Sequence, residues 1–400
     1  MLDGLIDGLI HSFNGYWGIQ IIAVTMGKTE ETLLQILRAA LCSEPIRQFQ
    51  SDVNWEEVFQ LSNKNGVVAI AFDGITRSRE TYTSAMFPLD DERWEDLKYK
   101  WLGYSLDVQK NNKCKMRVLS EVANILYNKG VRILILKGYT LSIDYPNPSI
   151  RPLGDIDFYV LGQNKDGALN ADRFLSATLD VKVTKSIVSY HSHCVYQGVS
   201  IENHYELCNT YWHRGKTLYL EKKLRQLADE NCKPHGPINI PSADFNAVFL
   251  VWHMASHFCN GKAIVRQLCD WGVFLKTERN NINWSKVVDI WKESGLYVFA
   301  AVINGVAVDY IGLDPQYVPC RSNDTRLKQK VLMSFLSKPE PSALLYKIFQ
   351  YFKNSWKYRL TSGHSGLHFL INSGRLHLFH SNDLVEVPLS EDVPQRPFAH

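Results

Sequence analysis

The sequence has 400 residues, enough for two or three compact domains, and its 45% hydrophobic and 21% charged residues are typical of a globular protein. A formal net charge of +3 at pH 7 is too small to indicate a nucleic-acid-binding protein by itself. The 8 cysteines contain no C-x-x-C pair, which argues against a zinc ribbon or a dithiol redox motif. Reduced thiols in a cytoplasmic protein are therefore expected.

The N-terminal 25 residues are interpreted as an upstream extension, with Met26 as the start of the folded chain. Their apolar patch, 19–24, is too short to span a bilayer. A signal peptide would carry basic residues near its start, where this sequence has Asp3 and Asp7. No membrane association is therefore expected.

Helical periodicity dominates residues 26–130. A helix capped by Asp52 or Asn54 is predicted, then a loop over 78–90, then a long helix over 91–129 with apolar residues at three- and four-residue steps. A glycine directly after this helix ends it. The pattern predicts an N-terminal helical region that leads straight into a strand.

Two short strands follow. The apolar run 133–136 predicts a buried strand that ends at Lys137 and Gly138, and a second strand over 155–160 opens with two acids. Because side chains alternate along a strand, the two acids, Asp155 and Asp157, point to the same face. Paired carboxylates repel each other, so a cation beside them is expected, and oxygen ligands suit Mg²⁺. The alternative is a strand that merely begins with exposed acids.

The run L-K-G-x-x-L…Y-x-x-P…R-P-x-G-D-I-D-F-x-V resembles one branch of the nucleotidyltransferase superfamily related to DNA polymerase β. This branch is the uncharacterised bacterial nucleotidyltransferases often labelled NTP-transferase-5-like. The matching residues are Leu136, Lys137, Gly138, Tyr145, Arg151, Asp155, Ile156 and Asp157. The sequence departs from the superfamily after the glycine, where a second small residue is usual and Tyr139 followed by Thr140 stands here.

A helix near 168–178 is predicted next, and strands over 181–188, 191–197 and 199–206, the last two joined by a tight turn at Gly198.

The last of these strands carries the third acid. Glu202, His204 and Glu206 share one face by the period of two. The I-E-x-H-Y segment resembles the family's I-E-x-H-W, which implies that Glu202 is the third carboxylate, with Glu206 as the competing choice. His204 is expected to hold Glu202 or a phosphate oxygen, unless it is a hydrogen-bonded structural histidine.

Helices return over 218–354. One carries His253 and His257 at the spacing of a zinc helix, but the glutamate of metalloproteases and a third ligand are missing. Arg266 and Asp270 lie four apart and are able to pair along one helix face. The resemblance implies that this helical domain closes over the nucleotide; a buried structural network is the alternative.

These patterns predict an α+β fold. A nucleotidyltransferase core with a small mixed sheet, 131–217, lies between the N-terminal helical region 26–130 and the C-terminal helical domain 218–354. The segment 355–400 is predicted to be a basic, aromatic tail, which is either a contact for an anionic partner or a partly ordered end.

The resemblance implies a metal-dependent nucleotidyltransferase that moves a nucleoside monophosphate from an NTP, such as ATP, to an unknown acceptor hydroxyl on a small molecule, a protein or a tRNA. Mg²⁺ or Mn²⁺ is the implied cofactor, with Asp155, Asp157 and Glu202 as catalytic metal ligands. The implied nucleotide-binding residues are Lys137, Gly138, Thr140, Arg151, His204, Arg266 and Asp270.

Two alternatives stay open. The chain is either a catalytically inactive nucleotide-binding or partner-binding module of the same fold, or a toxin-type enzyme that modifies a tRNA or protein. Tyr139 in the small-residue position favours an inactive module, whereas the presence of all three acids favours an enzyme. Removing one charge from so crowded an acidic cluster is expected to leave the metal-free fold as stable as before or more stable.

Overall fold

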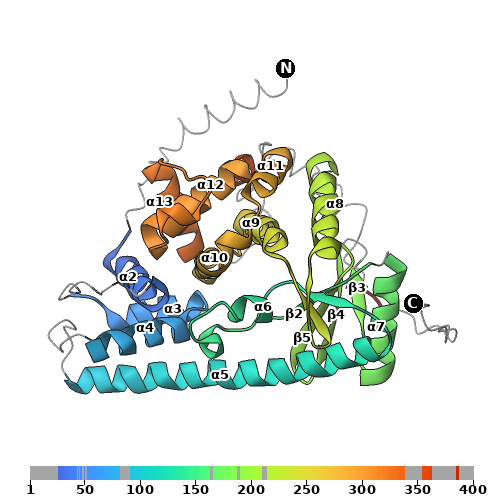
Figure 1. Cartoon of the computed structure of the whole chain (residues 1–400). Helices are drawn as coiled ribbons and strands as arrows, with labels where there is room; N and C mark the ends of the chain where they lie inside the picture. Colours follow the sequence, from blue (N-terminus) through green and yellow to red (C-terminus); the bar gives the residue numbers. More distant parts are fainter. Residues whose placement is uncertain are drawn as a thin grey trace, which may run out of the picture.

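A computed structural model places most of the chain (Figure 1). The described residues are 26–42, 44, 46, 49, 52–81, 91–162, 165–186, 190–209, 214–337, 354–362 and 384–386. The extension interpreted at residues 1–25 lies outside them, as do most of the loop predicted over 78–90 and most of the tail 355–400.

Four helices form the described N-terminal region: α2 (Lys28–Cys42), α3 (Trp55–Lys64), α4 (Val68–Thr81) and α5 (Asp91–Asn128). The Asn54 side chain accepts a hydrogen bond from the backbone N–H of Glu57 and caps α3, so of the two predicted caps, Asp52 and Asn54, the structure has Asn54. The long helix is also confirmed, because α5 is continuous for 38 residues. In Figure 1 it runs beneath both the N-terminal helices and the sheet.

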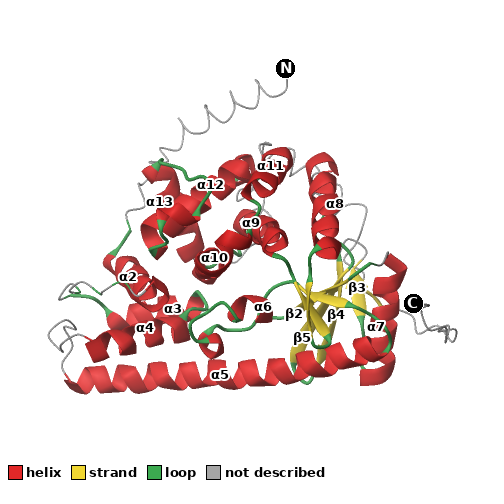
Figure 2. Cartoon of the chain, viewed as in Figure 1, coloured by secondary structure: helices red, strands yellow, loops and turns green. Residues whose placement is uncertain are grey.

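The sheet is mixed and follows the order β6-β7-β1-β2-β5-β4-β3-β8. Its strands are β1 (Ile133–Ile135), β2 (Ile156–Val160), β3 (Thr184–Ser186), β4 (His191–Tyr196), β5 (Val199–His204), β6 (Lys233–His235), β7 (Ile238–Ile240) and β8 (Leu384–Glu386). Strand β2 runs antiparallel to β1 and parallel to β5. Helices surround this sheet (Figure 2), so the α+β class is confirmed.

The sheet extends beyond the strands that the sequence predicts. The stretch from residue 218 onward is expected to be helical, but after α8 (Arg214–Glu230) it contains the hairpin β6–β7, which adds to the sheet beside β1. Three-residue strands that contain or flank proline carry no usable periodicity, which explains the error. Strand β8, from the predicted tail, pairs with β3 at the other edge.

The remaining helices flank the sheet or pack on other helices away from it (Figure 1). They are α6 (Tyr139–Ser142), α7 (Lys165–Leu179), α9 (Ala243–Cys259), α10 (Val265–Glu278), α11 (Trp284–Ser294), α12 (Tyr297–Val306), α13 (Thr325–Leu336) and α15 (Ser355–Ser362). The described start of the tail is thus a helix, and its Tyr358 is buried with its hydroxyl 3.4 Å from the carbonyl oxygen of Cys259. Among the described residues, no helix is long and apolar enough to cross a membrane.

The two faces of the sheet carry separate apolar cores. Ile156 and Phe158 belong to the core that α5 and α7 complete, whereas Tyr159 belongs to the larger core formed with α8, α9 and α10. Since side chains alternate along β2, Asp157 points to the same face as Tyr159. The candidate site therefore lies on the face covered by the C-terminal helices.

Candidate active site

Two acids meet on neighbouring strands. In the parallel pair β2–β5, Asp157 is the register partner of Glu202. Parallel pairing aligns side chains on one face, so the two carboxylates lie side by side although they are far apart in the sequence. This is the convergence that the sequence predicts for these two residues.

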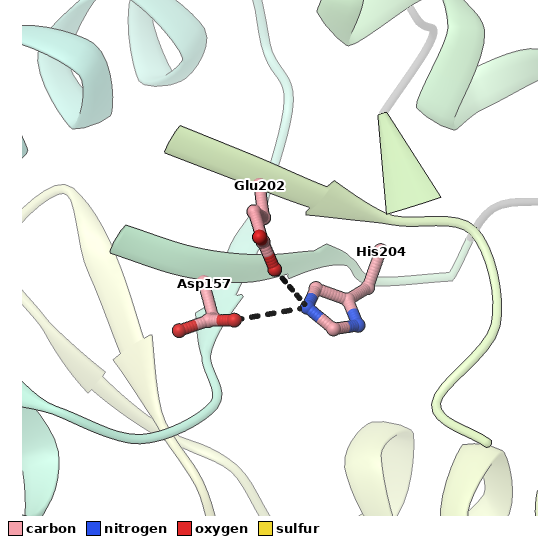
Figure 3. Close-up of side chains that lie close together, drawn as sticks. All are labelled: Asp157, Glu202 and His204. Atoms are coloured by element: carbon pink, nitrogen blue, oxygen red, sulfur yellow. Dashed lines mark hydrogen bonds and ion pairs between the residues drawn. The ribbon is translucent and has the colours of Figure 1, made fainter. Parts of the chain in front are cut away.

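His204 completes a group of three with these acids (Figure 3). Its Nε2 atom lies 3.1 Å from Asp157 Oδ1 and 3.7 Å from Glu202 Oε2. The ligand atoms of these three side chains all lie within 4.8 Å of one another, which is close enough to hold a metal ion. No other group of three His, Cys, Asp or Glu side chains among the described residues meets this condition. The other carboxylate oxygen of Asp157, Oδ2, is buried and has no hydrogen-bond partner.

Lys137 provides a positive charge at the centre of the site. Its Nζ lies 3.2 Å from Asp157 Oδ1 and 3.2 Å from Nε2 of His253 on α9. The side chain of Asp157 is 1% exposed, whereas that of Lys137 is 26% exposed. The lysine therefore links a buried acid to the solvent-facing side of the site.

The surroundings shift the pKa values of Asp157 and Glu202 in opposite directions. Burial alone raises the pKa of Asp157, but the charge of Lys137 and the hydrogen bond from His204 outweigh it and hold that pKa well below its usual range. Burial, followed by the charge of Asp157, raises the pKa of Glu202 to about 8. Asp157 is thus the fixed negative charge of the site, and Glu202 holds a proton near neutral pH.

This donor set fits a divalent cation. Asp157 offers a buried oxygen without a partner, and Glu202 offers a second carboxylate that a nearby positive charge would ionise. Carboxylate oxygens suit Mg²⁺ and Mn²⁺.

The other two candidate acids lie outside this group. Asp155 is exposed and immediately precedes β2, close enough for its charge to raise the pKa of Glu202. Glu206 follows the end of β5, and its backbone N–H bonds to the carbonyl oxygen of Tyr190. Of the two acids considered for the third position, the structure brings Glu202 to Asp157. Metal binding by Asp155 stays a prediction.

The predicted phosphate cradle directly follows β1. Gly138 has φ +69° and ψ −101°, a backbone conformation that favours glycine, and it turns the chain into α6. Thr140 on α6 is buried, and its hydroxyl has no hydrogen-bond partner. Lys137, Gly138 and Thr140 are thus adjacent at one end of the paired acids, and their binding of a nucleotide stays a prediction.

Arg151 and Asp270 form a buried ion pair. Arg151 donates from Nε to Asp270 Oδ1 over 2.9 Å and from Nη2 to Oδ2 over 2.7 Å. The hydroxyl of Tyr145 also donates to Asp270 Oδ1, over 2.8 Å. Asp270 therefore pairs with Arg151 and not with Arg266, the partner that spacing on one helix suggests. Sequence spacing missed this contact because it joins the sheet region to α10.

Arg266 is a partly buried residue with one side-chain nitrogen that has no partner. Its Nη1 lies 3.4 Å from the carbonyl oxygen of Pro152, and its buried Nε has no partner. Burial, then the charge of Arg151, lowers the pKa of Arg266. Whether it contacts a nucleotide stays a prediction.

Helix α5 holds the segment that leads to Asp155. The side-chain amide of Asn112 donates to the carbonyl oxygens of Ser149 and Arg151 and accepts from the backbone N–H of Leu153, each over 2.9 Å. Lys115 Nζ lies 2.6 Å from the carbonyl oxygen of Leu153. Sequence reasoning placed α5 but missed this clamp, because nothing marks Asn112 as other than a surface residue.

The zinc alternative gains no support from the geometry. His253 and His257 are neighbours, with ring centroids 4.2 Å apart, but neither belongs to a three-ligand group among the described residues. Burial, then the charge of Lys137, lowers the pKa of His257 to about 4. His253 instead contacts Lys137, a connection between α9 and the sheet that sequence reasoning did not predict.

Comparison with known families agrees with this geometry. A family model described as an uncharacterised nucleotidyltransferase matches residues 51–311. The match covers the strands β1 to β7, all the residues of the site and the helices α9 and α10. No curated protein matches the chain.

Proposed function

The chain belongs to a family of uncharacterised nucleotidyltransferases, and from this premise we propose that it transfers a nucleoside monophosphate from an NTP to an acceptor hydroxyl in a reaction that needs Mg²⁺ or Mn²⁺. The observation that carries the proposal is the group formed by Asp157, Glu202 and His204, in which a buried carboxylate oxygen has no partner. Unpaired buried oxygens are costly, and a bound cation would satisfy this one.

In the reaction a P–O bond forms to the acceptor, while the P–O bond to pyrophosphate and the acceptor O–H bond break. The acceptor oxygen attacks the α-phosphorus of the NTP, its proton passes to solvent, and pyrophosphate leaves with the electron pair of the broken P–O bond. Asp157 and Glu202, with Asp155, would hold a divalent cation, which would activate the hydroxyl and neutralise charge at the phosphoryl oxygens.

The chain's own residues orient the nucleotide. Gly138 lets the backbone approach the triphosphate closely, and the buried hydroxyl of Thr140 is available to a phosphate oxygen. Lys137 contributes positive charge next to them. His204 holds Asp157 in place through the contact at Oδ1. The helices α9 and α10 cover this face and limit the access of water.

The test is transfer of label from α-³²P-labelled NTPs. Purified protein is incubated with each NTP, Mg²⁺ or Mn²⁺, and a cell lysate as the source of acceptor, with Asp157→Asn as the matched control. We expect labelled acceptor with the wild type and none with the variant. Metal-dependent NTP binding without transfer to any lysate component would favour the inactive module, and absence of metal-dependent NTP binding would refute the proposed function.

A further inference from the structure

Lys137 is the counter-ion of Asp157 in the candidate active site. The side chain of Asp157 is 1% exposed, and Lys137 Nζ lies 3.2 Å from its Oδ1 atom in an ion pair. No other lysine or arginine of the described residues forms an ion pair with Asp157. Oδ1 also lies 3.1 Å from Nε2 of His204, and the protonated Glu202 carboxyl interacts with Asp157 without adding a positive charge. In the absence of a metal, the charge of Asp157 is therefore balanced mainly by one lysine.

The second neighbour of the Lys137 ammonium, Nε2 of His253, is a hydrogen-bond donor and not an acceptor. The orientation of the Gln267 side chain is fixed, because its Oε1 accepts from the backbone N–H of Ile264 over 3.1 Å. Its Nε2 therefore donates to Nδ1 of His253, over 3.3 Å. A neutral imidazole with an acceptor at Nδ1 carries its proton on Nε2. The Nε2 atom 3.2 Å from Lys137 thus cannot accept a hydrogen bond from the ammonium.

The ammonium of Lys137 is consequently held by a single acceptor among the described residues. An ammonium has three N–H donors, and here two of them have no protein partner. The side chain is 26% exposed and directly precedes Gly138 at the predicted phosphate cradle. These two donors are available to an anion that arrives from the open side.

A divalent cation on Asp157 would take away this single acceptor. The cation would neutralise the carboxylate and repel the ammonium at short range, because the site is shielded from water. Lys137 would then carry an uncompensated charge beside the cradle, where phosphate oxygens are its natural acceptors.

We propose that Lys137 is a provisional counter-ion of Asp157, which a divalent cation releases to the triphosphate, so that cation and NTP bind cooperatively through this one side chain. The proposal rests on the proposed function, since it assigns the order of events at that same site. By linkage, the cation strengthens NTP binding through Lys137 by the same factor as NTP strengthens cation binding.

The first test measures the chemical reactivity of Lys137. The whole protein is acetylated with limiting acetic anhydride at pH 8 and the modified lysines are quantified by mass spectrometry, with the exposed Lys262 as an internal reference. We expect slow modification of Lys137 in EDTA, a several-fold rise with saturating Mg²⁺, and renewed protection when an α,β-methylene NTP analogue is added. Unchanged reactivity under saturating Mg²⁺ would overturn the proposal.

The second test measures binding of Mn²⁺ alone by titration with electron paramagnetic resonance. Lys137→Met should bind Mn²⁺ more tightly than the wild type, on the order of tenfold for one like charge removed beside the ion. Lys262→Met, which removes an equal charge without touching Asp157, should stay within about twofold of the wild type. The variant at Lys137 should also lose most of the coupling between Mn²⁺ and the NTP analogue.

The outcomes separate this proposal from the proposed function. If the wild type binds Mn²⁺ and the analogue but Lys137→Met binds Mn²⁺ no better, the counter-ion role is wrong and the nucleotidyltransferase function stands. If the wild type binds neither ligand, both are wrong. Circular dichroism of each variant confirms that the fold is retained.

Discussion

Asp157 and Glu202 occupy partnered positions on two parallel strands, yet their pKa values move in opposite directions. Lys137 and His204 both approach Asp157 within hydrogen-bonding distance, whereas burial and the charge of Asp157 dominate at Glu202. One acid is therefore committed to the ionised form, and the other is ready to ionise when a cation arrives.

Asp157→Asn should abolish transfer and also destabilise the metal-free protein, by about 1–3 kcal/mol for lost charge-assisted hydrogen bonds. The structure thus reverses the expectation from sequence, because Asp157 is paired and not merely crowded by other acids. Its depressed pKa gives stability that is present above the ordinary value of 3.8 and is lost as pH falls through the folded-state pKa. Urea denaturation in EDTA at pH 7 and pH 3 measures the difference, which should shrink at the lower pH.

Glu202→Gln should change how stability depends on pH. The folded protein keeps the proton of Glu202 up to about pH 8, whereas the ordinary value is 4.5. Between these values the unfolded chain binds fewer protons than the folded one, so the wild type loses stability as pH rises, and the full penalty is present above pH 8. Melting curves in EDTA should show the variant above the wild type at pH 8.5 and close to it at pH 4.5. Parallel pH profiles would contradict the raised pKa.

Asp270→Asn should destabilise the protein by about 3–5 kcal/mol, since it leaves the buried charge of Arg151 unpaired. Urea denaturation is the measurement. Glu230→Gln, which breaks an exposed pair with Lys286, serves as the control and should change stability little. A folded Asp270→Asn protein with normal NTP affinity would show that the residue is structural; a selective loss of affinity would support the role in nucleotide binding.

Gly138→Ala should cost about 1–3 kcal/mol of backbone strain, because an L-residue rarely adopts φ +69° with ψ −101°. No clash adds to this cost, since the nearest atom to a new Cβ is 3.8 Å away, the carbonyl oxygen of Asp155. Gly154→Ala, at a position with open space and ordinary φ, is the matched control and should be nearly neutral. Equal effects in the two variants, measured by urea denaturation and NTP titration, would show that the backbone conformation of Gly138 is not required for stability or NTP binding.

The sequence alone was sufficient to predict the helices and strands whose apolar residues follow a regular period. The D-x-D strand, the Glu202 strand and the long helix all follow from apolar periodicity with a period of two or 3.6. The choice of Glu202 over Glu206 as the partner of Asp157 came from the family resemblance of the I-E-x-H-Y segment, and the strand register agrees with it. The cap of α3 was narrowed by sequence to Asp52 or Asn54, and the structure has Asn54.

Contacts between distant elements could not be predicted in this way. Arg266 stands four residues before Asp270, the spacing of a helical pair, but the planar fork of Arg151 reaches both carboxylate oxygens from another element. Likewise, His253 suggested a zinc helix, although its actual neighbours are Lys137 and Gln267. Side-chain partners across the fold depend on packing angles that periodicity does not contain.

Helix α5 has a consequence for dividing the protein into fragments. Its Trp101 lies in the core with the N-terminal helices, and its Val118 and Leu126 lie in the core beneath the sheet. The boundary suggested at residue 130 therefore separates the sheet from the helix that covers its underside. A truncated chain that starts at 131 should expose the apolar faces of β1 and β2 and aggregate, whereas a protease that cuts within α5 should cause both cores to unfold together.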